Sequence, residues 1–208
     1  MEDVLDLYAK SYDPKEPVIC FDEKSKELRE DTRKVQHTKK GRPRRRDYEY
    51  TRNGTANIFM TVEPKGGYRT THLTKQRTRQ DFAHELKRIS SLSRYRNARI
   101  LHIVLDNLNT HTEKSLQETF DKRETARIMK KVRFHYTPEH ASWLNMAEIE
   151  IGVMSKQAIK GRIGTSTRLR AQLRAWQKRR NDAHCKINWT FTKKEAKKKF
   201  NYRHAKLN

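Results

Sequence analysis

Three carboxylates in this chain stand at positions where they could bind divalent metal ions. Asp22 and Asp106 each end an apolar run typical of a buried strand, and Glu148 lies in a segment typical of a helix. Carboxylate oxygens are hard ligands that suit Mg²⁺ and Mn²⁺, whereas histidine ligands would favour zinc. Two such ions can activate an attacking oxygen and stabilise a leaving oxygen at a phosphodiester. The three residues therefore predict a metal-dependent phosphoryl-transfer site in which Asp22 bridges both ions.

Each of these carboxylates also has a simpler interpretation. Asp22 and Asp106 could form turns or cap helices, because aspartate side chains bond to nearby amides, and Glu23 competes with Asp22 as the ligand. Glu148 and Glu150 lie on opposite flanks of one helical stripe, so helical periodicity does not choose between them. That apolar stripe consists of Leu144, Ala147, Ile151, Met154 and Ala158.

The charge of the chain predicts a polyanionic partner. Lys and Arg number 48 against 25 Asp and Glu, which gives a formal net charge of +23 spread along the sequence. Binding to DNA phosphates would release counterions and weaken steeply with added salt.

No apolar run approaches the roughly 18 residues of a membrane span, and the acidic amino terminus does not resemble a signal peptide. We expect a cytoplasmic, nucleoid-associated protein with no membrane partner, in which Cys20 and Cys185 stay reduced.

One basic segment is the expected DNA contact. Residues 24–47 lack apolar periodicity and contain Gly and Pro among clustered cations, so we predict a surface loop. The alternative is that this loop is only solvated. Its candidate DNA-binding residues are Lys39, Lys40, Arg42, Arg44, Arg45 and Arg46.

The order of apolar runs predicts an α/β fold. The expected strands span 17–21, 57–62, 68–73, 100–105 and 134–136. The expected helices span about 75–92 and 112–132, and another begins near 142. A short connection at 64–67 makes the second and third strands a hairpin, and the later strands alternate with helices. This order predicts a mixed five-stranded sheet flanked by helices, as in the ribonuclease H-like fold.

Four motifs in this order resemble a known family. They lie at 21–24, 53–57, 105–111 and 140–148, the last containing His140-Ala141-Ser142-Trp143-Leu144-Asn145 before Glu148. They are similar to the catalytic core of bacterial insertion-sequence DDE transposases of the mariner-related superfamily, over about residues 1–192. The resemblance implies that Asp22, Asp106 and Glu148 are the catalytic residues and bind two Mg²⁺ ions, with Mn²⁺ as a substitute. It also favours Glu148 over Glu150.

The resemblance carries expectations about partners and domains. It implies double-stranded DNA at transposon ends and target sites, and a homodimer that cuts two ends together. The family's helix-turn-helix region has no counterpart in the 16 residues before the first expected strand, so we expect a separate part to recognise the ends. The catalytic domain is expected at 1–192 and a basic tail at 193–208. His111 could contact a phosphate or the metal-bound water, or simply begin a helix.

Three hypotheses follow for function. The leading one is a DNA transposase catalytic domain that cleaves phosphodiesters and transfers strands with metal ions. The second is a basic DNA-binding relic of a transposase without catalysis. The third is a ribonuclease H-like nuclease that acts on RNA or branched DNA.

Overall fold

The sheet has the predicted strands in a mixed arrangement. The computed structural model describes residues 1–33, 38, 40–42 and 47–200. Its strands are β1 (Val18–Asp31), β2 (Tyr50–Glu63), β3 (Tyr68–Thr74), β4 (Leu101–Leu105) and β5 (Val132–Tyr136). They form one sheet in the order β3-β2-β1-β4-β5, in which β1 to β3 are antiparallel neighbours and β1, β4 and β5 run parallel. The predicted α/β class and ribonuclease H-like order are confirmed.

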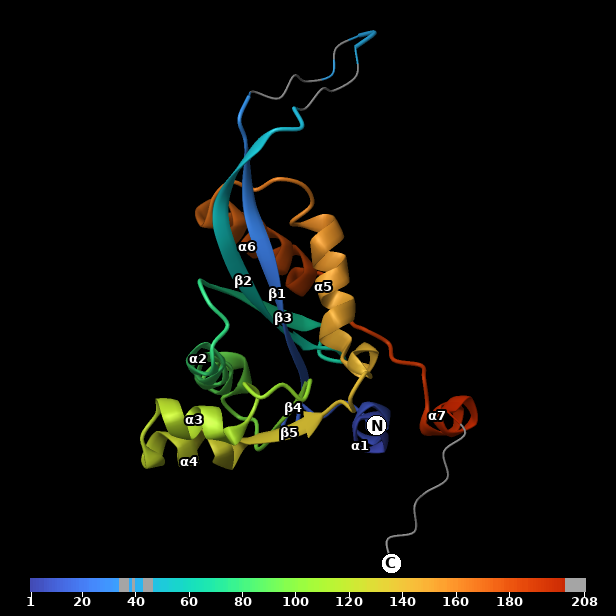
Figure 1. Cartoon of the computed structure of the whole chain (residues 1–208). Helices are drawn as coiled ribbons and strands as arrows, with labels where there is room; N and C mark the ends of the chain where they lie inside the picture. The colour runs from blue at the N-terminus through green and yellow to red at the C-terminus, as the bar shows by residue number, and fades with distance from the viewer. Residues whose placement is uncertain (34–37, 39, 43–46, 201–208) are drawn as a thin grey trace, which may run out of the picture.

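Strands β1 and β2 are much longer than the sequence predicted. The predicted loop at 24–47 is wrong for its first part, because β1 continues to Asp31 and pairs there with Tyr50 of β2. The two strands project beyond the rest of the sheet as a ribbon (Figure 1). Backbone pairing sustains this ribbon although Leu28 is the one apolar residue of β1 after Phe21. The hydrophobic pattern of the sequence therefore gave no sign of it.

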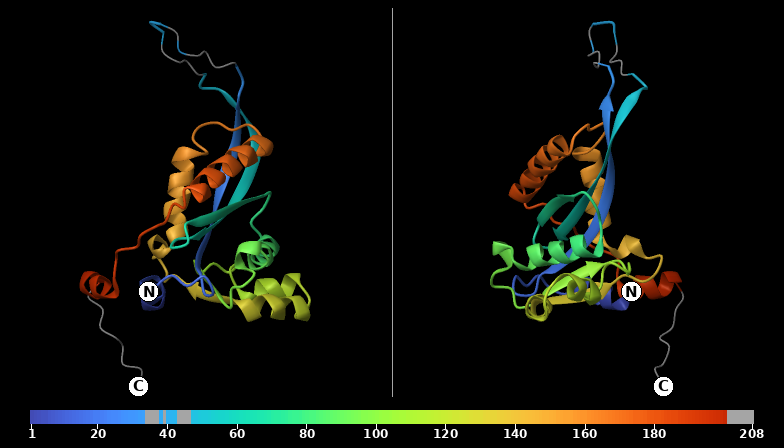
Figure 2. Two further views of the ribbon diagram at one scale, coloured as in Figure 1. Left: turned by 180° about the vertical axis from the view of Figure 1, so that it is seen from behind. Right: turned by 60° about the vertical axis from the view of Figure 1, so that its left-hand side comes forward.

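Helices cover both faces of the sheet. On one face lie α2 (Arg79–Ser90), α3 (Glu113–Thr119) and α4 (Lys122–Lys131), so the single helix expected at 112–132 is two. On the other face lie α5 (Met146–Gln157) and α6 (Ser166–Asp182), as Figure 2 shows from two sides. Short 3₁₀ turns occur at Ser93–Tyr95 and Ser142–Leu144.

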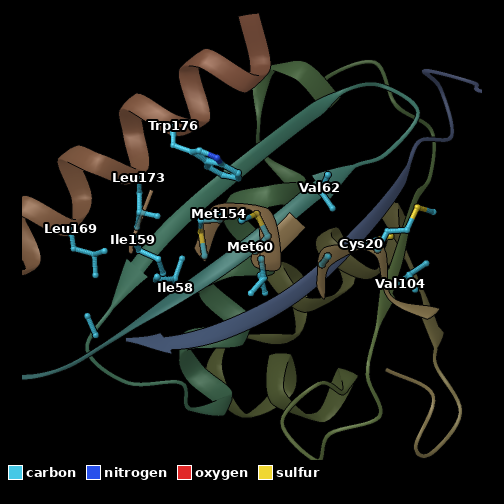
Figure 3. Close-up of a cluster of buried hydrophobic side chains, with 14 of the residues drawn as sticks. Cys20, Ile58, Met60, Val62, Val104, Met154, Ile159, Leu169, Leu173 and Trp176 are labelled. Atoms are coloured by element: carbon cyan, nitrogen blue, oxygen red, sulfur yellow. The ribbon is translucent and has the colours of Figure 1, made fainter. Parts of the chain in front are cut away.

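Alternate residues of β1 pack into two separate cores. Ile19 and Phe21 lie in the core under α2, whereas Cys20 lies in the core under α5 and α6. This alternation follows from the two-residue period of a strand. Figure 3 shows the second core, in which side chains of α6 point at the sheet. Even-numbered positions of β1 near residue 20 therefore face α5.

Both ends of the chain form helices that pack together. Helix α1 (Glu2–Ala9) meets α7 (Lys193–Phe200), and Lys193 Nζ lies 2.8 Å from Asp6 Oδ2. Ala196 of α7 is buried against Leu5. The first part of the predicted tail at 193–208 is thus a docked helix, and residues 201–208 lie outside the described residues.

Cys20 and Cys185 are free thiols, as expected. Within the described ranges, no helix is long and apolar enough to span a membrane.

A buried ion cluster joins α5 and α6 to the sheet. Glu150 of α5 is fully buried, and its carboxylate lies 2.9 Å from Arg69 Nε of β3 and 2.6 Å from Arg180 Nε of α6. Arg69 also donates to the backbone oxygens of Gly67 and Arg180 at 3.1 Å. Because the arginines come from different elements, Glu150 fixes the position of α5 against both.

We expect Glu150→Ala to destabilise the fold strongly. The substitution leaves Arg69 buried without its counter-charge, and breaking such a pair costs about 3–5 kcal/mol of unfolding free energy. Urea unfolding of the purified protein measures this cost. Glu139→Ala, which removes an exposed carboxylate, should stay within about 0.5 kcal/mol of the wild type. A loss below about 1 kcal/mol for Glu150→Ala would show that Arg69 finds solvent or another partner.

Candidate active site

The parallel pairing of β1 with β4 brings two of the predicted carboxylates to one face of the sheet. Cys20 of β1 is the register partner of Val104 of β4, and both side chains lie in the core under α5. Asp22 and Asp106 each stand two residues further along, so both face the same side. Asp22 lies within β1, and Asp106 directly follows the last residue of β4.

Asn145 places the third carboxylate beside them. Its Oδ1 accepts a hydrogen bond from the Ala147 amide at 3.1 Å, which caps the start of α5. Its Nδ2 donates to the backbone oxygen of Phe21 at 2.8 Å, directly before Asp22. Glu148, in the first turn of α5, is therefore held close to β1. The motif analysis included Asn145 without assigning it this role, because its partner is 124 residues away.

The electrostatics of Asp22 show that the carboxylates interact. Burial raises the pKa of Asp22 to about 7, and repulsion by Asp106, Glu23 and Glu148 adds to it, although a hydrogen bond from the Glu23 amide opposes the rise. Neither Asp22 nor Glu148 has an ion-pair partner in the described part of the chain. No group of three or more His, Cys, Asp or Glu side chains in these described ranges has the closeness of a ready-made metal cage.

Glu23 points away from this cluster and contacts His111. Glu23 Oε2 lies 3.1 Å from His111 Nε2, and His111 Nδ1 lies 2.5 Å from Asp106 Oδ1. His111 directly precedes Thr112, the N-cap residue of α3, and it is 1% exposed, so it lies buried at the start of that helix and is not open to a phosphate. Burial lowers the pKa of His111, but hydrogen bonds to Asp106 and Glu23 outweigh it and raise the pKa to about 9. The histidine thus links the end of β4 to β1.

The structure separates the remaining candidates. Glu150 is bound to Arg69 and Arg180 on the opposite flank of α5 and is excluded from the cluster. Of the predicted DNA-binding residues, the structure describes two as exposed at the far end of the ribbon, Lys40 and Arg42. Outside the described residues lie Lys39, Arg44, Arg45 and Arg46.

Comparisons with known proteins agree with this architecture. A family model described as "DDE superfamily endonuclease" matches residues 17–170. The crystal structure of a Mos1 mariner paired end complex with Mn is similar, with a TM-score of 0.57 and 16% identity over 88% of this chain and 54% of that one. The Mos1 strand transfer complex gives a TM-score of 0.58 and 15% identity, over 88% and 53%. The chain thus spans about half the length of these proteins, and their likeness supports the ribonuclease H-like fold. A comparison with curated proteins finds no match.

We expect Asp22→Asn to stabilise the metal-free protein. Because the pKa of Asp22 is raised from 3.8 to about 7 by folding, the native state binds this proton more tightly and loses stability as pH rises between those values. The substitution removes that loss. Its gain in unfolding free energy should grow from pH 4 to pH 7 and then level at about 1–2 kcal/mol, allowing for solvent screening.

Urea unfolding in EDTA across this pH range checks the expectation. Asp182→Asn serves as the matched control, because Asp182 is an exposed aspartate whose partner is Lys178. It should change stability by no more than about 0.5 kcal/mol at any pH. A pH-independent effect of Asp22→Asn would contradict the raised pKa of Asp22.

Proposed function

This chain belongs to the DDE superfamily of endonucleases, and we propose that it is the catalytic domain of a DNA transposase. One observation supports this most. Asp22, Asp106 and Glu148 come together from β1, the end of β4 and α5. Burial, with repulsion by Asp106 and Glu148, raises the pKa of Asp22, and neither Asp22 nor Glu148 has a cationic partner in the described part of a chain with net charge +23. Carboxylates that are held together despite burial and repulsion are typical of a site that binds cations and reacts with a polyanion.

The donor set fits divalent metal ions, whose use the family implies. All three side chains supply hard oxygen donors without histidine or thiol, which suits Mg²⁺, with Mn²⁺ as a substitute. We propose that Asp22, Asp106 and Glu148 would together hold two ions. When bound, they supply activation of the attacking oxygen and stabilisation of the leaving oxygen in an in-line displacement.

The chain's own residues position these ligands. The contact with His111 occupies Asp106 Oδ1 and leaves the other carboxylate oxygen available. Asn145 holds the start of α5, and with it Glu148, against the backbone beside Asp22. In this proposal water or a DNA 3′-hydroxyl attacks the phosphodiester, so the protein forms no covalent intermediate.

The proposed partners follow from this reaction. The proposed substrate is double-stranded DNA at transposon ends and at the target, and the two similar Mos1 structures are a paired end complex and a strand transfer complex. We propose that the chain acts as a homodimer, with end recognition by a separate helix-turn-helix part. A cytoplasmic, nucleoid-associated location would give it access to DNA.

We expect Mn²⁺ to raise the unfolding temperature of the wild type but not of Asp106→Asn or Glu148→Gln. A ligand that binds only the native state stabilises it by mass action, by about 2.7 kcal/mol at 100 times its Kd. Both substitutions remove a ligand charge. The same proteins are then incubated with duplex DNA, an RNA–DNA hybrid and branched DNA in Mn²⁺. Asp106→Asn should lose cleavage of duplex DNA while its salt-dependent DNA binding stays nearly unchanged.

Glu139→Gln is the control, because Glu139 is an exposed carboxylate nine positions before Glu148 (148 − 139). It should respond to Mn²⁺ as the wild type does. Equal cleavage by the wild type and Asp106→Asn would reject the catalytic assignment. No response to Mn²⁺ in any protein would favour the DNA-binding relic, and preference for the hybrid or branched DNA would favour the third hypothesis.

We further expect two substitutions of His111 to behave differently. The Asn amide in His111→Asn can take the place of Nδ1 next to Asp106, whereas the Gln amide in His111→Gln reaches the place of Nε2 next to Glu23. Loss of a group that orients a metal ligand typically weakens metal affinity about 10–100-fold. His111→Gln should therefore weaken Mn²⁺ affinity about 10-fold, and His111→Asn much less.

The unfolding temperature in EDTA separates this effect from general damage to the fold. Both variants lose one of two buried contacts, so both should lose similar stability without metal. Equal Mn²⁺ affinities for the two variants would contradict a specific role for the contact with Asp106.

A further inference from the structure

A long stretch of the chain carries positive charge without any carboxylate. Between Glu150 and Asp182 there is no Asp or Glu, while nine Lys and Arg residues occur. They are Lys156, Lys160, Arg162, Arg168, Arg170, Arg174, Lys178, Arg179 and Arg180. Charge runs are often only solvated, so the placement of each cation in the fold decides what this stretch can do.

Some of these cations have structural partners. Arg162 Nη1 lies 2.7 Å from Oδ1 of Asp31, the last residue of β1 in the β1–β2 ribbon. Arg180 binds the buried Glu150. Both therefore stabilise the fold and are unavailable as free charges.

The inner face of α6 is firmly anchored to the sheet. Leu169, Leu173 and Trp176 are buried and point toward β2 and β3 (Figure 3). Gln177 Oε1 accepts a hydrogen bond from the Thr71 amide at 2.7 Å, which ties the helix to β3. The orientation of α6 is thus fixed, and its other face is held toward solvent.

That outer face of α6 carries several exposed cations, and the residues beside them have short side chains. Its exposed cations are Arg168, Arg170, Arg174, Lys178 and Arg179, and the exposed residues between them are Thr167, Ala171 and Ala175. Residues four apart lie about 6 Å from each other along a helix, and like charges at this spacing destabilise it. Lys178 pairs with Asp182 at 2.6 Å. The four arginines have no ion-pair partner among the residues that the structure describes.

We propose that this outer face of α6 binds the phosphate backbone of double-stranded DNA, at a surface separate from the three carboxylates. The proposal rests on the proposed function, since it takes DNA as the partner. Unpaired arginines gain affinity from phosphates through counterion release, and short side chains between them let a backbone approach closely. A membrane-surface helix would instead expose apolar residues beside its cations, and this face exposes none of the large ones.

The position of α6 suits such a contact. It packs beside α5 on one face of the sheet, as the views in Figures 1 and 2 show. Asp22 and Asp106 lie on that face too, because each stands two residues after a residue of the core under α5 and α6. Phosphates bound along α6 would therefore lie on the same side of the protein as the reacting strand. The contact adds affinity without reading sequence, because phosphates carry none.

The test compares two variants that remove the same charge from opposite faces. One changes Arg168, Arg170, Arg174 and Arg179 to Gln. The other changes Lys114, Lys122, Arg123 and Lys130 to Gln, which are exposed on α3 and α4. Affinity for a short duplex of unrelated sequence is measured across a salt series. Each lost phosphate contact should reduce the slope of log affinity against log salt by about 0.9, so we expect a reduction of about 3–4 for α6 and below about 1 for the control.

The results of this experiment can reject the α6 surface without rejecting the proposed function. Equal reductions in both variants would show a general effect of net charge and overturn the α6 surface. An unchanged slope in the α6 variant, together with a wild-type response to Mn²⁺, would overturn the surface and leave the metal site standing. A reduced slope for α6 alone supports the surface even if the wild type neither binds Mn²⁺ nor cuts DNA.

Discussion

The register between β1 and β4 is the constraint on which the candidate site depends. The two strands pair in parallel over residues 18–20 and 102–104, and this short contact decides which way Asp22 and Asp106 face. A slip by one residue would turn one carboxylate to the opposite face of the sheet. Apolar residues on both sides prevent the slip, since Ile19 and Cys20 fill different cores. The packing of the two hydrophobic cores thus determines that Asp22 and Asp106 face the same side of the sheet.

Two glutamates of α5 differ in role, because one stabilises the fold and the other lies at the candidate site. Glu150 is buried with two arginines and joins α5 to β3 and α6. Glu148, half a turn away, faces Asp22 without a cation from the described residues. The repulsion at the second site is tolerable because the first holds α5 in place, and Asn145 fixes the helix start. Strain of this kind is usually kept where function requires it.

The sequence predicted the sheet, which the structure confirms, and the three carboxylates as site candidates, but it did not predict the contacts that hold them. Strand-end aspartates and the order of elements follow from local apolar patterns, which is why both could be read from the sequence. Periodicity could not separate Glu148 from Glu150, because the deciding partners are Arg69 and Arg180, distant in sequence. The bridge by His111 and the long ribbon of β1 were missed for the same reason. Both depend on contacts between residues that are distant in sequence, and the local hydrophobic pattern does not indicate such contacts.

Net charge alone would not locate a DNA contact on this protein. The cations differ in what they contact. Arg69 and Arg180 neutralise a buried carboxylate, whereas the arginines of the outer α6 face have no such partner in the described ranges. A phosphate that approaches Asp22 meets repulsion, so attraction must come from elsewhere. Exposed cations act over roughly a Debye length of 8–10 Å, whereas a divalent ion held by the carboxylates would also coordinate the reacting oxygens directly. In the proposed function, separating the two sources of attraction would let the protein hold DNA by charge and react with it by metal chemistry.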